Sequence, residues 1–416
     1  MFQAFHSERP PQPRTTATGV ARETTADQVT VGLVGCIFAV SGPTAIMLAV
    51  GNQAGMAHSE LASWLFGAFF INGLISLIMC WTYRQPIVFL WSIPGIVLVG
   101  PALEHLSFAE VLGAYYAAGA AMLILGLSGW VRRIMEAIPL PIVMGMVAGV
   151  FLQFGLDWIK AFSSAPVIAI SMTTAFFAST AIPAVANRIP PLIIAIATGS
   201  LCVAGFGDGP AMAEMSFMLA TPVFQVPAFS WQAILELVVP LMITVLAAQN
   251  SQGITVLTVA GHQPPINTIT FICGIGSLAT ATVGTVSTCL TGPLSAILAG
   301  GGTAREGQYV AALIACIGAI LFGLFAPFFT SLMLATPAEF ISTLAGIALL
   351  TVLRGAFTAA FRGDFAMGGL IAFMLTVSDI SLFNIGAPFW GLVFGLATSW
   401  LLERHDFDVR GPKASD

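Results

Sequence analysis

The sequence predicts an all-α integral membrane protein with fourteen transmembrane spans, arranged as two inverted seven-span repeats. Three observations lead to this fold class. First, the 416-residue chain is 57% hydrophobic and only 8% charged, whereas a soluble protein carries about a quarter charged residues. Second, the apolar runs are around twenty residues long, which suits helices and not the short alternating strands of a barrel. Third, two runs are broken in the middle at corresponding positions of the two halves.

The chain begins with a polar segment, residues 1–26, that is rich in Pro, Thr and Arg. It has no apolar region of the kind that a signal peptide needs, so we expect a disordered cytoplasmic tail. A second cytoplasmic tail is expected over 404–416. Between the tails, the fourteen predicted spans lie near residues 27–50, 60–82, 86–103, 108–128, 138–157, 164–186, 190–206, 232–253, 266–283, 284–300, 308–329, 336–353, 365–380 and 386–402.

The basic residues predict the orientation of the spans. With the N-terminus inside, thirteen of the fourteen Lys and Arg residues fall on the cytoplasmic side and only Lys160 falls outside. This asymmetry is what the positive-inside rule requires, and a miscount of one span in the middle would destroy it. Both termini are therefore expected in the cytoplasm.

An internal repeat relates the two halves of the chain. The first repeat covers residues 27–208, a periplasmic linker covers 209–231, and the second repeat covers 232–403. Each repeat holds seven spans, and because seven is odd the second copy enters from the opposite face, as in transporters that work by alternating access. At an offset of 197 residues the matched positions are Pro43 with Pro240, Gly95 with Gly292, and Gly149 with Gly346.

Spans 3 and 10 are each expected to be part extended strand and part half-helix. In span 3, residues 89–92 precede Pro94, which disfavours a helix just before it. Pro94 and Gly95 then suit the first turn of a helix. In span 10 the β-prone run 284–289 precedes Thr291, Gly292 and Pro293, which open a second helix. A strand plus a short helix crosses the bilayer in fewer residues than a full helix does.

These two breaks predict a site for an anion. Span 3 starts inside and span 10 starts outside, so both half-helices have their N-termini near the middle of the membrane. Helix N-termini present N–H groups and partial positive charge, which attract an anion. The predicted binding residues are Ser92, Pro94, Gly95, Thr291, Gly292 and Pro293. The alternative is a pair of ordinary proline kinks, which are common in membrane helices.

Span 8 carries the most polar run within an apolar span, and Gln249 and Asn250 lie at its centre. We expect these two residues to face the substrate, with hydrogen bonding between helices as the alternative. Ser41, next to Pro43 in span 1, is a weaker candidate, with a helix kink as the alternative. Gly145 and Gly149 are spaced for close helix packing.

Few other groups point to chemistry. The carboxylates Glu236, Glu339, Asp157 and Asp379 lie close to span ends, so we expect them at the membrane interface, and the proton-coupling residue stays unknown. The five His and six Cys residues have no ligand spacing, so we expect neither a metal site nor a cofactor. The expected partners are the lipid bilayer and a small molecule, with no nucleic acid; the oligomeric state is open, with a homodimer as one arrangement.

Three runs in the second half resemble the benzoate/proton symporter family (BenE-type), which is similar to nucleobase and sulfate permeases. The resemblance extends over roughly residues 27–403. The runs that carry it are Ala247-Ala-Gln-Asn-Ser-Gln-Gly-Ile-Thr-Val-Leu257, Gly261-His-Gln-Pro-Pro-Ile-Asn267 and Thr285-Val-Ser-Thr-Cys-Leu-Thr-Gly-Pro293. It implies fourteen spans divided into a core domain and a gate domain, with spans 3 and 10 beside the substrate, in a bacterial inner membrane.

The resemblance further implies import of benzoate or a close aromatic carboxylate together with a proton. In nucleobase permeases the motif in span 8 reads Ala-Glu-Asn, and its Glu binds the base. The matching positions here are Ala248, Gln249 and Asn250, so the acid is replaced by an amide. This change suits an anionic substrate, which a carboxylate would repel.

Three classes of function compete on the sequence. A proton-coupled carboxylate symporter is the first, and an uncoupled anion channel of the same fold is the second, because dipole-lined sites also serve channels. A membrane-embedded enzyme is the third, and no nucleophile–base pair or metal cluster within the spans supports it. Among carriers, a nucleobase or other anion permease is the alternative substrate class.

Overall fold

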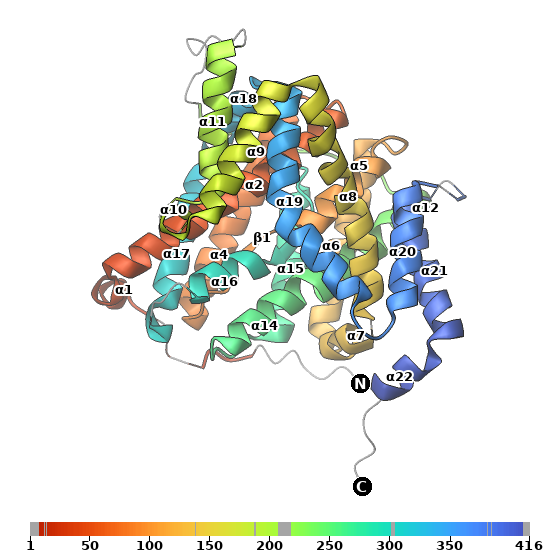
Figure 1. Cartoon of the computed structure of the whole chain (residues 1–416). Helices are drawn as coiled ribbons and strands as arrows, with labels where there is room; N and C mark the ends of the chain where they lie inside the picture. Colours follow the sequence, from red (N-terminus) through yellow and green to blue (C-terminus); the bar gives the residue numbers. More distant parts are fainter. Residues whose placement is uncertain are drawn as a thin grey trace.

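The chain folds into a bundle of helices around one short two-stranded sheet (Figure 1). The computed structural model describes residues 8–11, 13, 15–137, 139–186, 189–206, 218–300, 304–380, 382–383 and 385–410. The two strands lie within predicted spans 3 and 10, and the other predicted spans are mainly helical.

Within the described residues, seven helical segments are long and apolar enough to cross a membrane. Each coincides with one of the predicted spans, and most of the ends agree to within a few residues. Three of them change between α-helical and π-helical or 3-10 turns along their length, and are continuous all the same. The segments are Ala26–Gln53 (α2), His58–Tyr83 (α3, η1 and α4), Phe108–Ser128 (α6), Leu140–Ser164 (α8), Trp231–Val259 (α12 to α14), Arg305–Leu324 (η5 and α17) and Ala338–Phe361 (α19).

Shorter apolar helices occupy the other predicted spans. Predicted span 6 holds α9 (Pro166–Ala181) followed by the single turn α10 (Pro183–Ala186), because Pro183 interrupts the helix. The remaining short helices are α5 (Ile93–Ala102), α11 (Pro191–Phe206), α15 (Ile266–Ala281), α16 (Gly292–Gly300), α20 (Ala366–Ser378) and α21 (Ala387–Leu402).

Four further helices lie between or beside the predicted spans. Predicted span 11 ends early, at Leu324, because Pro327 opens a separate helix. The four helices are α1 (Ala17–Glu23), α7 (Val131–Ala137), α18 (Ala326–Leu334) and α22 (Arg404–Arg410). In Figure 1, α7 and α22 lie at the lower end of the bundle and α18 at the upper end.

The two broken spans are confirmed as strand followed by half-helix. Strand β1 (Phe89–Trp91) runs into α5, and strand β2 (Thr288–Leu290) runs into α16. The strands pair antiparallel, with Leu90 opposite Cys289. The turn that leads from α15 into β2 contains Gly284 at φ 89°, a conformation that favours glycine, and a Cβ there would lie 2.9 Å from Trp64.

The helices pack in two groups. In one group α6 packs against α15, and α17 packs against α2 and α4. In the other, α8 packs against α19 and α20, α20 against α21, and α9 against α11. Helix α2 also packs against α19, so the two groups share a long contact. The paired strands belong to the first group, where β2 contacts α15 and β1 contacts α4.

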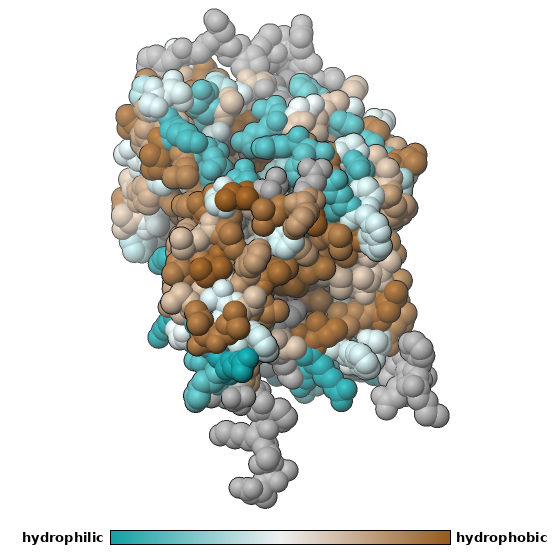
Figure 2. Space-filling view, turned by 90° about the vertical axis from the view of Figure 1, so that its right-hand side faces the viewer, coloured by the Kyte–Doolittle hydropathy of each residue, from teal (hydrophilic) through white to brown (hydrophobic). Residues whose placement is uncertain are grey.

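The surface has the distribution that a lipid environment requires. Figure 2 shows hydrophobic residues across the middle of one face and hydrophilic residues toward its upper and lower ends. Large apolar side chains are exposed on several of the helices, among them Ile78, Ile124, Leu201 and Trp400. A soluble protein rarely exposes a continuous apolar surface of this extent.

Residues 218–230, which belong to the predicted linker, run along one end of the bundle. Their backbone N–H groups donate to Leu324 at 2.8 Å, Thr282 at 3.1 Å and Ala109 at 2.8 Å. All three acceptors belong to span ends that the sequence places on the outer side, so the structure gathers these ends on one face. Residues 209–217 of the linker lie outside the described part of the chain.

A helix forms within the segment 1–26, for which the sequence predicts disorder. Thr16 caps α1 by accepting from the Gly19 N–H at 3.1 Å. At the end of α1, the Glu23 carboxylate binds the Arg84 guanidinium and the Tyr309 hydroxyl, each at 2.7 Å. These partners are distant in sequence, so composition could not reveal that the segment is held against α4 and α17.

Candidate functional site

The site begins with the paired strands, whose outer edges are hydrogen-bonded by side chains from neighbouring helices. On β1, the Phe89 N–H donates to Ser76 Oγ at 2.7 Å. On β2, the Leu290 N–H donates to Asn250 Oδ1 at 2.8 Å, and the Thr288 N–H donates to Ser277 Oγ at 2.9 Å. Backbone groups within a membrane must be satisfied internally, so these side chains allow a two-stranded sheet to exist there.

The two half-helices start at opposite ends of this short ribbon. The Ser92 N–H donates to the Ser287 carbonyl and the Thr291 N–H donates to the Val88 carbonyl, both at 3.0 Å. Ser92 and Thr291 are therefore separated by four residues along the ribbon, roughly 13 Å at 3.3 Å per residue. Each half-helix leaves the ribbon with N–H groups that have no partner within the helix.

Both half-helices begin with the proline arrangement that the sequence predicts. Pro94 is the second residue of α5 and Pro293 is the second residue of α16. Ser92 caps α5, because its Oγ accepts from the Gly95 N–H at 3.1 Å. Two further hydroxyls, those of Ser287 and Ser295, are buried here without a hydrogen-bond partner among the described residues. The region thus holds several polar groups that a ligand could engage.

A cavity of about 60 Å³ lies beside both helix starts. Ile93 at the start of α5 and Thr291 and Pro293 at the start of α16 all line it. Its other lining residues are Phe38, Ala39, Pro43, Ile46, Leu90, Trp91, Leu192, Gln249, Leu294, Ala348, Leu349 and Val352. We call this space the central cavity.

The predicted binding residues divide into those that line the central cavity and those that support it. Gln249, Thr291 and Pro293 line it. Asn250 supports it: its Oδ1 holds Leu290, and its side chain also lies 3.5 Å from Cys273 Sγ. Gln249 and Asn250 both belong to the π-helical turn η4 (Thr244–Asn250), a helix variant found frequently at functional sites.

The other predicted residues lie around the cavity without lining it. Ser92 acts as a helix cap, and Gly95 leaves room for Leu241, which a Cβ would approach to 3.2 Å. Gly292 faces Gln252, whose side chain would lie 2.6 Å from a Cβ at that position. The Ser41 hydroxyl donates to the Phe38 carbonyl of its own helix at 3.3 Å. Pro94 is buried within the first turn of α5.

Sequence reasoning missed the part of the cavity that comes from α11 and α19. Leu192, Ala348, Leu349 and Val352 form this part. Nothing in the sequence indicates that these residues line a cavity, because an apolar residue on a membrane helix can face lipid, another helix or a cavity equally well. Aromatic side chains also line the cavity, Phe38 from α2 and Trp91 from β1.

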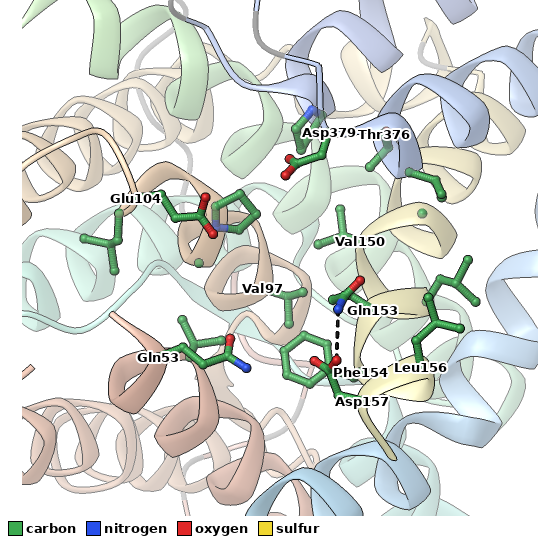
Figure 3. A pocket seen from close by; sticks show the side chains of 18 of the residues that line it. Gln53, Val97, Glu104, Val150, Gln153, Phe154, Leu156, Asp157, Thr376 and Asp379 are labelled. Atoms are coloured by element: carbon green, nitrogen blue, oxygen red, sulfur yellow. Dashed lines mark hydrogen bonds between the residues drawn. The ribbon is translucent and has the colours of Figure 1, made fainter. Parts of the chain in front are cut away.

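A second, larger pocket of about 440 Å³ lies at the far end of α5 (Figure 3). It is lined by the ends of α2 and α5 on one side and by α8 and α20 on the other. Val97 and Glu104 come from the α5 side, and Gln153 and Thr376 come from the opposite side. We call this pocket the vestibule. Under the predicted topology, all of these helix ends lie on the outer side.

The vestibule carries an acidic lining. Glu104, Asp157 and Asp379 contribute carboxylates to it. Asp157 is partly neutralised, because Gln153 Nε2 and Lys160 Nζ each donate to its Oδ1 at 2.9 Å. An acidic lining attracts cations and protons and opposes the approach of an anion.

Close to the vestibule, the Glu236 side chain is buried within the protein. Its side chain is only 5% exposed, and its Oε2 lies 3.0 Å from His105 Nε2. The other carboxylate oxygen faces Gly386 at the start of α21, where a Cβ would lie 2.6 Å away. Burial of a carboxylate requires such a partner. Glu236 therefore lies at a contact between the two groups of helices.

Within the part of the chain that the structure describes, no group of three or more His, Cys, Asp or Glu side chains could hold a metal ion.

Comparison with known proteins adds an independent finding. The chain is 28% identical to the inner membrane protein YdcO of Escherichia coli (strain K12) over 367 residues, which cover 88% of this chain and 93% of that protein. It is 27% identical to the benzoate membrane transport protein of Acinetobacter baylyi (strain ATCC 33305 / BD413 / ADP1) over 390 residues, or 92% of this chain and 95% of that one.

Among solved structures, the transmembrane domain of the cyanobacterial bicarbonate transporter BicA superposes with a TM-score of 0.60. The alignment covers 92% of this chain and 99% of that domain at 14% sequence identity, a likeness that establishes the fold alone. A family model described as "Benzoate membrane transport protein" matches residues 22–401. The match confirms the resemblance, and it shows that the chain is a membrane transporter and not an enzyme. The chain belongs to the BenE family of membrane transport proteins.

Proposed function

We propose that this protein imports benzoate, or a close aromatic carboxylate, together with a proton across a bacterial inner membrane. The observation that carries the proposal is the central cavity, which is lined by residues from the starts of both half-helices, by the Gln249 amide and the Thr291 hydroxyl, and by aromatic and aliphatic side chains. The name of the Acinetobacter relative supports the substrate class.

In this proposal the carboxylate lies at the polar corner of the cavity. Gln249 and Thr291 supply hydrogen-bond donors there, and the starts of α5 and α16 supply partial positive charge. Among the residues that the structure describes, no Lys or Arg lines the central cavity. Asn250 is a positioning residue, because it fixes the strand that precedes α16. The ring lies against Phe38 and Leu349.

The size of the central cavity supports a mechanism of alternating access. A cavity of about 150 Å³ is known to admit benzene, and the central cavity measures about 60 Å³. It must therefore widen before benzoate enters. We propose that the group with α8, α9, α11 and α19 to α21 acts as a gate against a core that carries the strands, within fourteen spans in two inverted repeats.

Sidedness follows from the predicted topology with both termini in the cytoplasm. The vestibule then opens to the outside, and the central cavity lies deeper along α5.

A homodimer is the proposed assembly, which a mass measurement in detergent or nanodiscs would test.

Proton coupling has an energetic rationale. Moving one negative charge inward against a membrane potential of 100 mV costs about 2.3 kcal/mol, which opposes accumulation by roughly 50-fold. A proton that moves with each carboxylate removes this cost. Symport is therefore the function that best suits uptake of a monovalent anion.

The test uses purified protein in proteoliposomes at neutral pH. Uptake of radiolabelled benzoate and lumenal pH are followed together, with protein-free liposomes as the control for diffusion of benzoic acid. Symport predicts protein-dependent uptake with acidification of the lumen and no response to a membrane potential. Uptake that follows the membrane potential without acidification would indicate a channel, and competition by uracil or xanthine would indicate a nucleobase permease.

A further inference from the structure

The walls of the central cavity differ in chemistry according to the helices that build them. The wall from β1, η4 and α16 includes the hydrogen-bonding side chains Trp91, Gln249 and Thr291. A second part of the lining comes from α2, α11 and α19. Its side chains are all hydrocarbon: Phe38, Ala39, Pro43, Ile46, Leu192, Ala348, Leu349 and Val352. We call this second surface the hydrocarbon wall.

This division orients an aromatic carboxylate. The carboxylate must keep hydrogen bonds when it leaves water, and the wall with Gln249 and Thr291 supplies them. The ring and its substituents then face the hydrocarbon wall. Helix backbone offers few replacement partners, because most carbonyl groups within α2 and α19 are already bonded along each helix. The exception in α2 is the Ala39 carbonyl, which lacks its usual donor because Pro43 has no N–H.

Over the rest of the hydrocarbon wall, a ring hydroxyl would therefore lose its bonds to water without replacement. Leaving a buried polar group unpaired is costly, whereas a methyl group of nearly the same size gains from burial. A hydrocarbon surface rejects a hydroxyl analogue of a methyl compound by on the order of 100-fold. Between ring substituents of equal size, polarity then decides which is accepted.

We propose that the hydrocarbon wall makes this transporter selective for aromatic monocarboxylates without ring hydroxyl groups, such as benzoate and its methyl derivatives. The inference rests on the proposed function and adds the substrate class that the same site selects. Val352 on α19 belongs to the hydrocarbon wall, so we expect it to help determine specificity. Thr has the same shape as Val, so a change to Thr adds only a hydroxyl at this position.

The first experiment measures competition against radiolabelled benzoate uptake in proteoliposomes at pH 7. The competitors are 4-methylbenzoate and 4-hydroxybenzoate, and the 3-substituted pair, all monoanions of similar size. We expect each hydroxy compound to need a concentration about tenfold or more above that of its methyl counterpart for half inhibition. Equal inhibition by the two members of both pairs would overturn the inference.

The second experiment uses Val352→Thr, which places a hydroxyl on the wall without changing its shape. We expect the ratio of half-inhibiting concentrations, hydroxy to methyl, to fall at least threefold for one of the two ring positions, since a hydrogen bond contributes about 1 kcal/mol. Val167→Thr on α9 is the matched control, because Val167 is 48% exposed on the bundle surface, and its ratio should equal that of the wild type.

These outcomes separate the inference from the proposed function. Absence of benzoate uptake by the wild type would refute both. Uptake of benzoate with equal competition by methyl and hydroxy compounds would refute the inference and leave the proposed function intact. A ratio that Val352→Thr leaves unchanged, although benzoate uptake persists, would refute the role of Val352.

Discussion

Asn250 Oδ1 accepts a hydrogen bond from the Leu290 N–H at 2.8 Å, and this bond ties the π-helical turn of span 8 to the strand that leads into α16. Asn250 is fully buried, as is Leu290. The bond joins segments that are 40 residues apart in sequence. It sets the position of the α16 start relative to Gln249, and so the geometry of the polar corner.

Replacing Asn250 by Ala should lower stability and transport together. The Leu290 N–H would be left buried without a partner, at a cost of about 1–3 kcal/mol. Thermal unfolding in detergent measures this loss, alongside benzoate uptake. Gln249→Ala is the comparison, because Gln249 lines the cavity and is expected to alter benzoate affinity with little change in melting temperature. Equal melting temperatures for Asn250→Ala and the wild type would contradict the positioning role.

Replacing Gln249 by Glu should weaken benzoate uptake by more than tenfold. Two like charges about 4 Å apart repel by about 4 kcal/mol at an effective dielectric constant of 20. Gln249→Met removes the hydrogen bond without adding charge and should have a smaller effect. Because acid neutralises a Glu side chain, uptake by Gln249→Glu relative to wild type should recover as pH falls. Wild-type uptake by Gln249→Glu at neutral pH would place the carboxylate elsewhere.

The glycine pair in span 5 predicts a steric effect on stability. A Cβ at Gly145 would lie close to the Gly369 carbonyl of α20, and one at Gly149 would lie 2.7 Å from Thr376. Gly145→Ala should therefore lower stability by about 1–3 kcal/mol. Gly355→Ala is the matched control, since a Cβ at Gly355 meets nothing within 4 Å, and that helix-interior change should be neutral or stabilising. Equal melting temperatures for the two variants would disprove the close contact.

His262, between α14 and α15, predicts a pH dependence of stability. Burial lowers the pKa of His262, while its hydrogen bond to Gln308 at 2.7 Å and the charge of Glu306 act in the opposite direction and Arg305 adds to the lowering. Between the folded-state pKa and the ordinary value near 6.5, the unfolded chain binds more protons than the folded one. The contribution of His262 to stability is thus present above pH 6.5 and is lost as pH falls.

The measurement compares melting temperatures at pH 7.5 and pH 5 for the wild type and His262→Gln. Other titrating groups contribute to both proteins and cancel in the comparison. We expect the wild type to lose more stability on acidification than the variant does. A larger loss for the variant would mean that His262 is stabilised in its charged form.

The strand and half-helix plan could be predicted because its signals are local. Pro94 and Pro293 each bar a helix before them and favour one after them, and Gly284 permits the turn into the second strand. The pairing of β1 with β2 could not be read in the same way, because it joins residues about two hundred positions apart.

The candidate site was predictable on its polar side only. Gln249 and Thr291 are conspicuous because a polar residue within a span needs a reason to be there. Leu192, Leu349 and Val352 are not, since nothing in a single sequence separates a cavity-facing Leu from a lipid-facing one. The same limit applies to Asn250: the sequence predicts that it faces the substrate, whereas in the structure it does not line the central cavity and accepts from the Leu290 N–H, a bond that depends on the tertiary fold.

The position of bound substrate decides whether the central cavity is the binding site. A structure of the protein with 4-iodobenzoate, whose iodine marks the far end of the ring, would show both ends of the ligand. We predict the carboxylate beside Gln249 and Thr291, between the starts of α5 and α16, and the iodine against the hydrocarbon wall. A ligand found only in the vestibule, or with its carboxylate against Leu349, would contradict the account.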